Sequence, residues 1–217
     1  MSGFSYSTVK CVICGSSIEE TVYEGTHTNG FYDLDLRPSG MLRITMPHLV
    51  HYCKKCGYAS PTVGLIESEK VKNYVLSDEY RRVFVKLKEN TGKPFILYGL
   101  ILKHLGNIPK SAHTFLRAAW MYDDQHKDKI ARTCRLIAIY LFEKVPHLKK
   151  ENVMMLIDMK RRVGDFKGAI GTMRLYRENL EGKEDLNFRW VACERRLCIE
   201  KNTKAYSIKD LLNDEGD

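Results

Sequence analysis

Two pairs of cysteines are the residues of this chain best suited to chemistry. Cys11 and Cys14 form one Cys-x-x-Cys pair, Cys53 and Cys56 form a second, and a glycine follows each pair. A Cys-x-x-Cys turn lets two sulfurs face one ion, and the trailing glycine supplies the backbone freedom that the turn needs. Four thiolates predict one bound metal ion. We expect zinc, although iron in a rubredoxin-like site uses the same ligands.

A closed site of this kind predicts a structural role for the metal. Four protein ligands leave no position for water, so the ion is expected to stabilise the fold and not to catalyse. A redox-active Cys-x-x-Cys usually opens a helix and occurs once per domain, which fits two copies poorly. The other three cysteines, Cys134, Cys193 and Cys198, are expected to be buried thiols. Residues 1–10 show no secretory signal, so we expect a reducing, cytoplasmic compartment, where metal binding is favoured over disulfides.

Several polar residues lie between the two pairs and suggest a weaker, enzymatic alternative. They are Glu24, His27, Asp33, Asp35, His48 and His51. We expect surface or supporting roles for them, because four cysteines leave His51 no ligand position and strand alternation places Asp33 and Asp35 on a solvated face. The sequence contains no phosphate-binding glycine loop, no Gly-x-Ser-x-Gly and no His-Glu-x-x-His. We therefore assign no catalytic residue, and an enzyme is the less favoured interpretation.

The segment that carries the cysteines reads as short strands. Residues 18–27 read as extended, and period-two alternation at 31–36 and 41–46, around a Pro-Ser-Gly turn, predicts a β-hairpin. A strand at 49–52 would lead into the second pair. Residues 1–60 are therefore predicted to form a zinc ribbon.

The remainder, residues 61–212, has a helical pattern, and 213–217 form an acidic tail. The fold class is thus α+β and mostly α, with a small N-terminal β zinc ribbon before an all-α domain of tetratricopeptide-like helical hairpins. Caps, prolines and apolar spacing predict helices at about 77–88, 94–105, 110–122, 128–144, 151–163, 166–180 and 185–201, with a last turn at 207–212.

Two turns support the tetratricopeptide-like interpretation. Gly164-Asp165-Phe166 precedes Ala169, a small residue that would let two antiparallel helices approach closely. A looser copy, Leu105-Gly106-Asn107, precedes Ala112. The spacing from Ala112 to Ala169 is 57 residues, which is no multiple of 34, so we expect hairpins and not a regular solenoid.

The net charge of +8 is concentrated in one part of the chain. Residues 1–60 are neutral, whereas residues 125–177 hold thirteen Lys/Arg against five Asp/Glu. Such a run is usually a solvated helix face, but it could also form a groove for a protein, an acidic peptide or a nucleic-acid backbone. The candidate partner-binding residues are Lys149, Lys150, Lys160, Arg161, Arg162 and Arg174.

The two cysteine motifs together resemble a known family. Cys-Val-Ile-Cys-Gly, the later Cys-Lys-Lys-Cys-Gly-Tyr-Ala and the helical remainder are similar to an uncharacterised bacterial domain of unknown function with tetratricopeptide-like helices. That family has proline where this chain has Val12 and Lys54. The resemblance implies a metal-binding protein of the bacterial cytosol with no assigned reaction.

The expected function is that of a zinc-binding scaffold or adaptor for protein interaction. The alternative is a nucleic-acid-binding factor that uses the basic helical surface 125–177, and a metal-dependent enzyme is the weaker third. No apolar run reaches the roughly 18 residues of a membrane span, so no membrane partner is expected.

Overall fold

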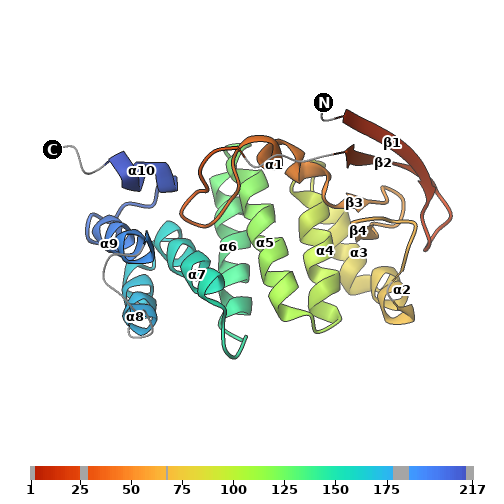
Figure 1. Ribbon diagram of the computed structural model, residues 1–217. Coiled ribbons are helices and arrows are strands. Elements are labelled where there is room, and N and C mark those ends of the chain that lie inside the picture. Colours follow the sequence, from red (N-terminus) through yellow and green to blue (C-terminus); the bar gives the residue numbers. More distant parts are fainter. Residues whose placement is uncertain (1–2, 25–28, 67, 178–185, 214–217) are drawn as a thin grey trace. The chain divides into compact units, whose positions relative to one another are not determined.

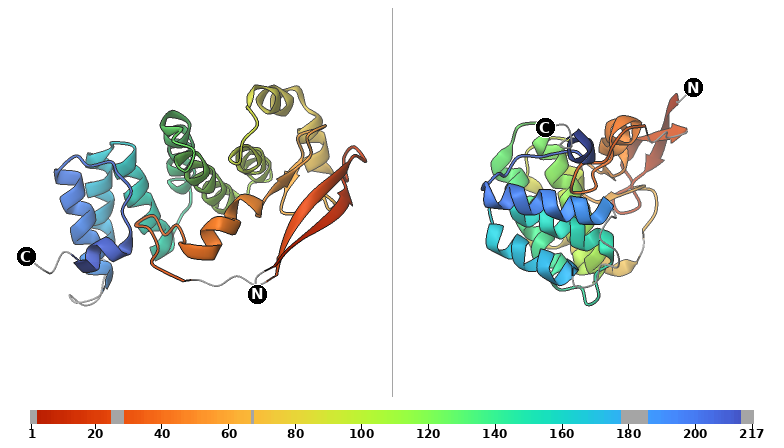
Figure 2. Two further views of the ribbon diagram at one scale, coloured as in Figure 1. Left: turned by 90° about the horizontal axis from the view of Figure 1, so that it is seen from above. Right: turned by 60° about the vertical axis from the view of Figure 1, so that its left-hand side comes forward.

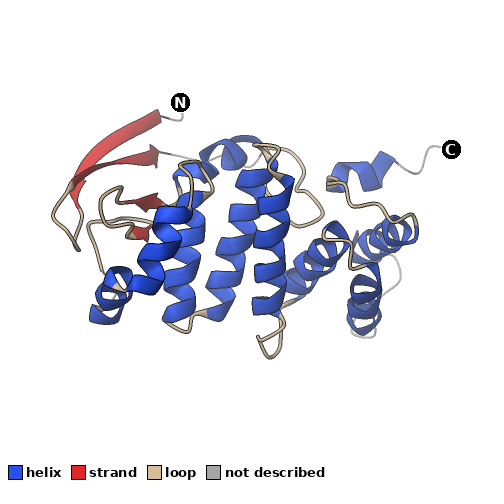
Figure 3. Cartoon of the chain, turned by 180° about the vertical axis from the view of Figure 1, so that it is seen from behind, coloured by secondary structure: helices blue, strands red, loops and turns tan. Residues whose placement is uncertain are grey.

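The protein is mostly helical, with short antiparallel strands near its N-terminus (Figures 1 and 3). This computed structural model describes residues 3–24, 29–66, 68–177 and 186–213. The named strands all lie before residue 61 and the helices follow from residue 40 onward. The α+β, mostly α class expected from the sequence is confirmed.

Contacts divide the chain into two compact units. Unit 1 contains residues 1–27 and 44–141, and unit 2 contains residues 28–43 and 142–217. A stretch between the two cysteine pairs therefore packs with the C-terminal helices. The sequence predicts a boundary at residue 60 between a zinc ribbon and a helical domain. The division by contacts does not test that boundary, which stays a prediction. Residues 214–217 of the expected acidic tail lie outside the described part of the chain.

Two small hairpins begin unit 1, and each holds one cysteine pair in its turn. The first is formed by β1 (Gly3–Lys10) and β2 (Ser17–Glu24), the second by β3 (His51–Tyr52) and β4 (Ala59–Ser60). Both hairpins are antiparallel. The extended residues expected at 18–27 and 49–52 overlap β2 and β3, while β1 was not expected.

The longer helices of unit 1 follow the second hairpin. They are α2 (Glu69–Leu76), α3 (Asp78–Lys86), α4 (Lys93–His104), α5 (Ile108–Asp123) and α6 (Asp128–Phe142), whose last residue belongs to unit 2. Gly99 lets α4 and α5 approach closely, because a Cβ there would lie 2.9 Å from the Phe115 ring. Ser111 Oγ also donates to the Gly99 carbonyl at 2.8 Å. These two helices run side by side in Figure 1.

The described part of unit 2 contains four C-terminal helices and the segment 29–43, which includes the start of a short helix at Gly40. The helices are α7 (Lys150–Arg162), α8 (Phe166–Arg177), α9 (Leu186–Ile199) and α10 (Ile208–Asn213). Their buried core includes Ile157, Met173 and Trp190, and Leu34 from the inserted segment joins it. Trp190 Nε1 donates to the Leu34 carbonyl at 3.2 Å. The insertion is therefore part of the core of unit 2.

The β-hairpin predicted over 31–46 is wrong. Residues 34–35 form a turn, around which the Asp33 N–H donates to the Arg37 carbonyl at 2.9 Å and Leu36 has a φ of 60°, and Asp33 makes an isolated bridge with Ser207. Residues Gly40–Thr45 form the short helix α1, and Met46–His48 form the 3-10 helix η1. Six alternating residues fit a strand by pattern alone, but here Leu34 and its neighbour Asp35 are both buried within unit 2. Tertiary packing decides the conformation of such short runs.

The two predicted helical turns share one geometry. Gly106 and Gly164 have φ of 78° and 83°, and each donates to the carbonyl three residues earlier, at 3.0 and 2.8 Å. Asn107 and Asp165 each donate to the carbonyl five residues earlier, both at 2.9 Å. The side-chain oxygen of each then accepts the backbone N–H three residues later, at 3.3 and 2.9 Å. The glycine ends one helix and the Asx residue caps the next, so the turns that join α4 to α5 and α7 to α8 are equivalent.

Candidate metal centre

The first cysteine turn is closed by two backbone hydrogen bonds. The Cys11 N–H donates to the Ser16 carbonyl at 2.8 Å, and the Gly15 N–H donates back to the Cys11 carbonyl at 2.8 Å. Gly15 has a φ of 71°, in the left-handed region that favours glycine. The turn brings both cysteines to one side of the chain.

The second cysteine turn repeats these bonds at the same positions. The Cys53 N–H donates to the Tyr58 carbonyl at 2.8 Å, and the Gly57 N–H donates to the Cys53 carbonyl at 2.7 Å. Gly57 has a φ of 82°. Two turns of equal geometry, from separate hairpins, thus present four sulfurs.

The four sulfurs converge on one point. All four lie within 4.8 Å of one another, with Cys11 Sγ 3.6 Å from Cys56 Sγ and Cys14 Sγ 3.4 Å from Cys53 Sγ. A tetrahedral ion with Zn–S bonds of about 2.3 Å requires sulfurs about 3.8 Å apart. A disulfide requires about 2.05 Å, and all four thiols are free. The spacing and the donor set therefore fit a four-coordinate metal ion.

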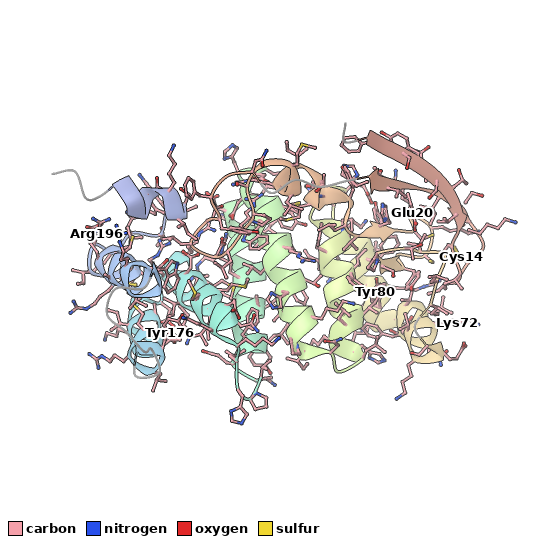
Figure 4. All side chains as sticks on the ribbon, in the orientation of Figure 1. Cys14, Glu20, Lys72, Tyr80, Tyr176 and Arg196 are labelled. Atoms are coloured by element: carbon pink, nitrogen blue, oxygen red, sulfur yellow. The ribbon has the colours of Figure 1, made fainter. Side chains whose placement is uncertain are left out.

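Burial gives the four thiols different environments. Cys11, Cys53 and Cys56 are buried, and burial raises the pKa of Cys11 and of Cys56. Cys14 is only partly buried (Figure 4). Burial opposes its ionisation, but hydrogen bonds with Ser16 and with neighbouring thiols lower the pKa of Cys14 to about 6. A cation at the centre would favour the thiolate form of all four.

Helix α3 supports the second cysteine turn. Tyr80, on α3, is fully buried and its hydroxyl donates to the Gly57 carbonyl at 2.7 Å (Figure 4). Phe84, one helical turn later, covers Gly57 so closely that a Cβ there would lie 2.8 Å from the ring. The Tyr58 hydroxyl donates to the Leu65 carbonyl at 2.6 Å. The second turn is thus held by side chains as well as by its own backbone.

Helix α4 adds a buried cation beside the same turn. Lys93 Nζ lies 2.7 Å from Glu89 Oε1, and the Tyr52 hydroxyl donates to the other Glu89 oxygen. The same ammonium lies 4.5 Å from the centre of the Phe84 ring and 5.5 Å from that of Tyr52. This pairing offsets the cost of burying the lysine.

The first turn is tied to the segment after β4. The Val12 N–H donates to the Val63 carbonyl at 3.0 Å, and the Val63 N–H donates to Glu20 Oε1 at 2.5 Å. Glu20 is buried on β2 (Figure 4). Both cysteine turns are therefore fixed to the rest of unit 1.

The polar residues between the cysteine pairs do not form one site. Asp33 and Asp35 belong to unit 2, whereas His48 and His51 belong to unit 1. The Thr21 N–H donates to His51 Nε2 at 3.1 Å, and His51 Nδ1 lies 2.9 Å from the Pro61 carbonyl oxygen. His48 packs against aromatic rings of the first hairpin.

The expectation that the two aspartates lie on a solvated face is wrong. Asp35 is buried and its carboxylate lies 3.2 Å from Arg162 Nη1. Asp33 lies 3.3 Å from Arg43 Nη1, and burial together with the charge of Asp35 raises its pKa to about 6. The Glu24 side chain and His27 lie outside the described residues.

Three of the six candidate partner-binding residues are members of ion pairs, and two of them, Lys160 and Arg161, are buried. Arg161 is 0% exposed and pairs with Asp158 and with Glu194, whose Oε2 lies 2.7 Å from Arg161 Nε. Lys160 pairs with Glu143 at 2.8 Å, and Arg162 pairs with Asp35. Their placement corrects the expectation of a solvated basic face at 160–162. Asp158, three residues before Arg161, was a local signal of this pairing.

The basic window 125–177 is also divided between the two units. Residues 125–141 belong to unit 1 and residues 142–177 to unit 2. Three arginines within the window pair with carboxylates outside it. The pairs are Arg135–Asp123, Arg161–Glu194 and Arg162–Asp35. The charge seen in the sequence is therefore partly cancelled by residues distant in the chain.

The other three candidates are exposed: Lys149 and Lys150 at the start of α7, and Arg174 on α8. Near them is an open cavity of about 460 Å³ between these two helices. One residue of its lining, Leu175, is strongly exposed. The cavity is lined by Leu148, Lys150, Val153, Leu156, Thr172, Leu175 and Tyr176. The sequence did not indicate this cavity.

Two of the three remaining cysteines are buried thiols, as expected from the sequence. Cys134 and Cys198 are buried, and burial raises the pKa of each to about 12. Cys193 is partly exposed on α9. Among the described helices, none combines the length and apolarity needed to cross a membrane.

These features define a protein with a four-cysteine site able to hold a metal ion, carried on two small hairpins and supported by helices. A family model described as "Uncharacterized protein conserved in bacteria (DUF2225)" matches residues 4–178, about four fifths of the chain. The chain belongs to this family, which confirms the resemblance drawn from the cysteine motifs. Comparisons with curated proteins and with solved structures each found no match.

Proposed function

We propose that the protein is a zinc-binding scaffold that recognises a protein partner through its helical hairpins. The convergence of four sulfurs within 4.8 Å of one another carries the metal part of the proposal. Soft thiolates favour zinc or iron over magnesium or calcium, and zinc accepts a tetrahedral site without redox chemistry. The bacterial cytoplasm, where thiols stay reduced, is the compartment that suits such a site.

The ion would serve the fold of unit 1. The two turns, 39 positions apart from Cys14 to Cys53, contact each other through the sulfur pairs Cys11–Cys56 and Cys14–Cys53. Without a cation, four converging thiols would leave the turns joined weakly, whereas structural zinc contributes free energy directly to folding. Because Tyr80 and Phe84 contact Gly57, loss of the metal would also disturb the packing of α3.

The partner site that we propose is the cavity between α7 and α8. It combines an apolar lining with Lys150 at its edge, and Lys149 and Arg174 are exposed nearby. Such a surface suits a short acidic peptide segment with one apolar anchor, because the anchor would enter the cavity while its carboxylates meet the cations. The equivalent turns of α4/α5 and α7/α8 support a tetratricopeptide-like description of these hairpins.

The metal and the peptide site are tested separately. Protein purified without chelator should contain zinc, and Cys53→Ser should lose it. For the peptide site, random peptides displayed on phage should yield sequences that join acidic residues to one apolar residue. Leu175→Asp, on the cavity, should abolish their binding, whereas Val85→Asp, at a strongly exposed position of α3, should leave it intact.

Lys150→Glu provides the matched test of charge. It should weaken acidic peptides and shift the selected sequences toward basic ones. Failure to enrich any sequence, or enrichment that Leu175→Asp leaves unchanged, would contradict the proposed partner site without affecting the metal site.

A further inference from the structure

The outer edge of β1 is unusually suited to pairing with another strand. Among the described residues only β2 pairs with β1 (Figure 2). Residues 3–9 carry no charge and no proline, and Phe4 and Tyr6 are 48% and 65% exposed. Native edge strands are usually protected from pairing by charged residues, proline or bulges. This edge lacks that protection over most of its length.

The hydrogen-bond pattern shows which groups of β1 point outward. The Thr21 N–H donates to His51 Nε2, which lies on the side of β2 away from β1. Thr21 and its partner Tyr6 therefore form a non-hydrogen-bonded pair, in which both backbones direct their polar groups away from each other. Because this direction alternates, the N–H and C=O groups of Phe4, Tyr6 and Thr8 all face the outer edge.

A ring contact on the same hairpin supports this assignment. Phe4 is opposite Tyr23, in a pair of the same type as Tyr6 and Thr21. Side chains approach more closely in non-hydrogen-bonded pairs, and the two rings have centroids only 4.4 Å apart. Ser5 and Ser7 lie in the alternate pairs, whose backbone groups hydrogen-bond to β2.

We propose that β1 pairs antiparallel with β1 of a second copy of this chain, with the two-fold axis at Tyr6. In that register Tyr6 lies opposite Tyr6 of the partner subunit, and Phe4 lies opposite Thr8 of the partner subunit. The outward groups of Phe4, Tyr6 and Thr8 then form a hydrogen-bonded ladder, and two ribbons become one four-stranded sheet.

The neutrality of the strand favours a second copy as the occupant. A two-fold pairing places each residue near its own equivalent, so any charge near the axis would meet a like charge. Residues 3–9 contain none, and Lys10 lies at the end of the strand, away from the axis. The ladder also places exposed aromatic rings beside each other across the axis, which stabilises antiparallel pairs. The inference depends neither on the metal nor on the cavity between α7 and α8.

Charge swapping at the axis tests the pairing. The molar mass of the metal-loaded full chain, measured by sedimentation over a range of concentrations, should rise toward twice the monomer value. Tyr6→Lys and Tyr6→Glu should each stay monomeric, because like charges would face each other. An equimolar mixture of the two variants should dimerise again. Val22→Lys adds the same charge to an exposed position of β2 and should dimerise like the native chain.

Amide exchange shows whether a monomeric variant keeps its hairpin. The amides of Phe4, Tyr6 and Thr8 should gain protection as the concentration of the native chain rises, whereas those of Ser5 and Ser7 should be protected throughout and stay so in Tyr6→Lys. A native chain that is monomeric at every concentration would overturn the proposal and leave an extended peptide as the occupant of the edge. Dimers of Tyr6→Lys alone, or no recovery in the mixture, would also overturn it.

Discussion

Alanine substitutions at the two glycines of the cysteine turns should destabilise the protein unequally. Both residues have positive φ, 71° at Gly15 and 82° at Gly57, and an alanine in that region costs about 1–2 kcal/mol. A Cβ at Gly15 would meet nothing within 4 Å, so Gly15→Ala should cost only that amount. A Cβ at Gly57 would lie 2.8 Å from Phe84, and overpacking adds about 1–3 kcal/mol. Gly57→Ala should therefore cost about 2–5 kcal/mol in total.

The assay is urea unfolding of the zinc-loaded protein, with both variants measured at the same free zinc concentration. A double-mutant cycle isolates the steric part. Phe84→Ala removes the obstructing ring, so Gly57→Ala should cost less in that background, by roughly the 1–3 kcal/mol assigned to overpacking. Gly15→Ala should cost the same with or without Phe84. Equal losses from the two glycine substitutions, or no coupling between positions 57 and 84, would refute the argument that α3 packs against the second cysteine turn.

Two further predictions concern the charged groups of unit 2. Arg161→Met should lower the free energy of unfolding by about 3–5 kcal/mol, because it leaves buried carboxylates without their cation. Arg174→Met, at an exposed position, should change the free energy of unfolding by no more than about 0.5 kcal/mol. Similar losses of stability in the two variants would contradict the buried ion pairs of Arg161. Burial and the charge of Asp35 raise the pKa of Asp33 to about 6, so the folded state binds more protons than the unfolded state between about pH 4 and 6. Stability should therefore fall as pH rises through this range, by on the order of 3 kcal/mol, and Asp33→Asn should remove that fall in equilibrium unfolding measured against pH; an unchanged pH profile would contradict the raised pKa.

The sequence was most informative where the determinants are local. Each cysteine turn is specified by five consecutive residues, from Cys11 to Gly15 and from Cys53 to Gly57, and the chemistry of thiolates then implies that the turns meet. The Gly-Asx turns at 106–107 and 164–165 are local in the same way, because glycine and a capping side chain end one helix and begin the next. Most helix bounds followed from such signals.

Sequence reasoning failed where distant residues decide the structure. The alternation at 31–36 is real, but Leu34 and Asp35 are both buried because the segment packs on helices that lie more than a hundred residues later. The run Lys160-Arg161-Arg162 looked like a solvated face for the same reason. Glu194, which neutralises Arg161, is 33 residues away, and no local pattern indicates that their side chains meet.

The insertion of residues 28–43 into unit 2 links the two units through the chain itself. The segment begins and ends between the cysteine pairs, yet it contributes Leu34 to the C-terminal core.

Metal content tests the central claim most directly. Protein purified without added metal or chelator should carry one zinc ion per chain by elemental analysis, and its four converging thiols should resist a thiol reagent until a chelator removes the ion. Cys11→Ser should lose the ion, while Cys134→Ser, at a buried cysteine outside the site, should retain it. Protein that contains no zinc or iron and whose Cys11, Cys14, Cys53 and Cys56 react freely would contradict the account.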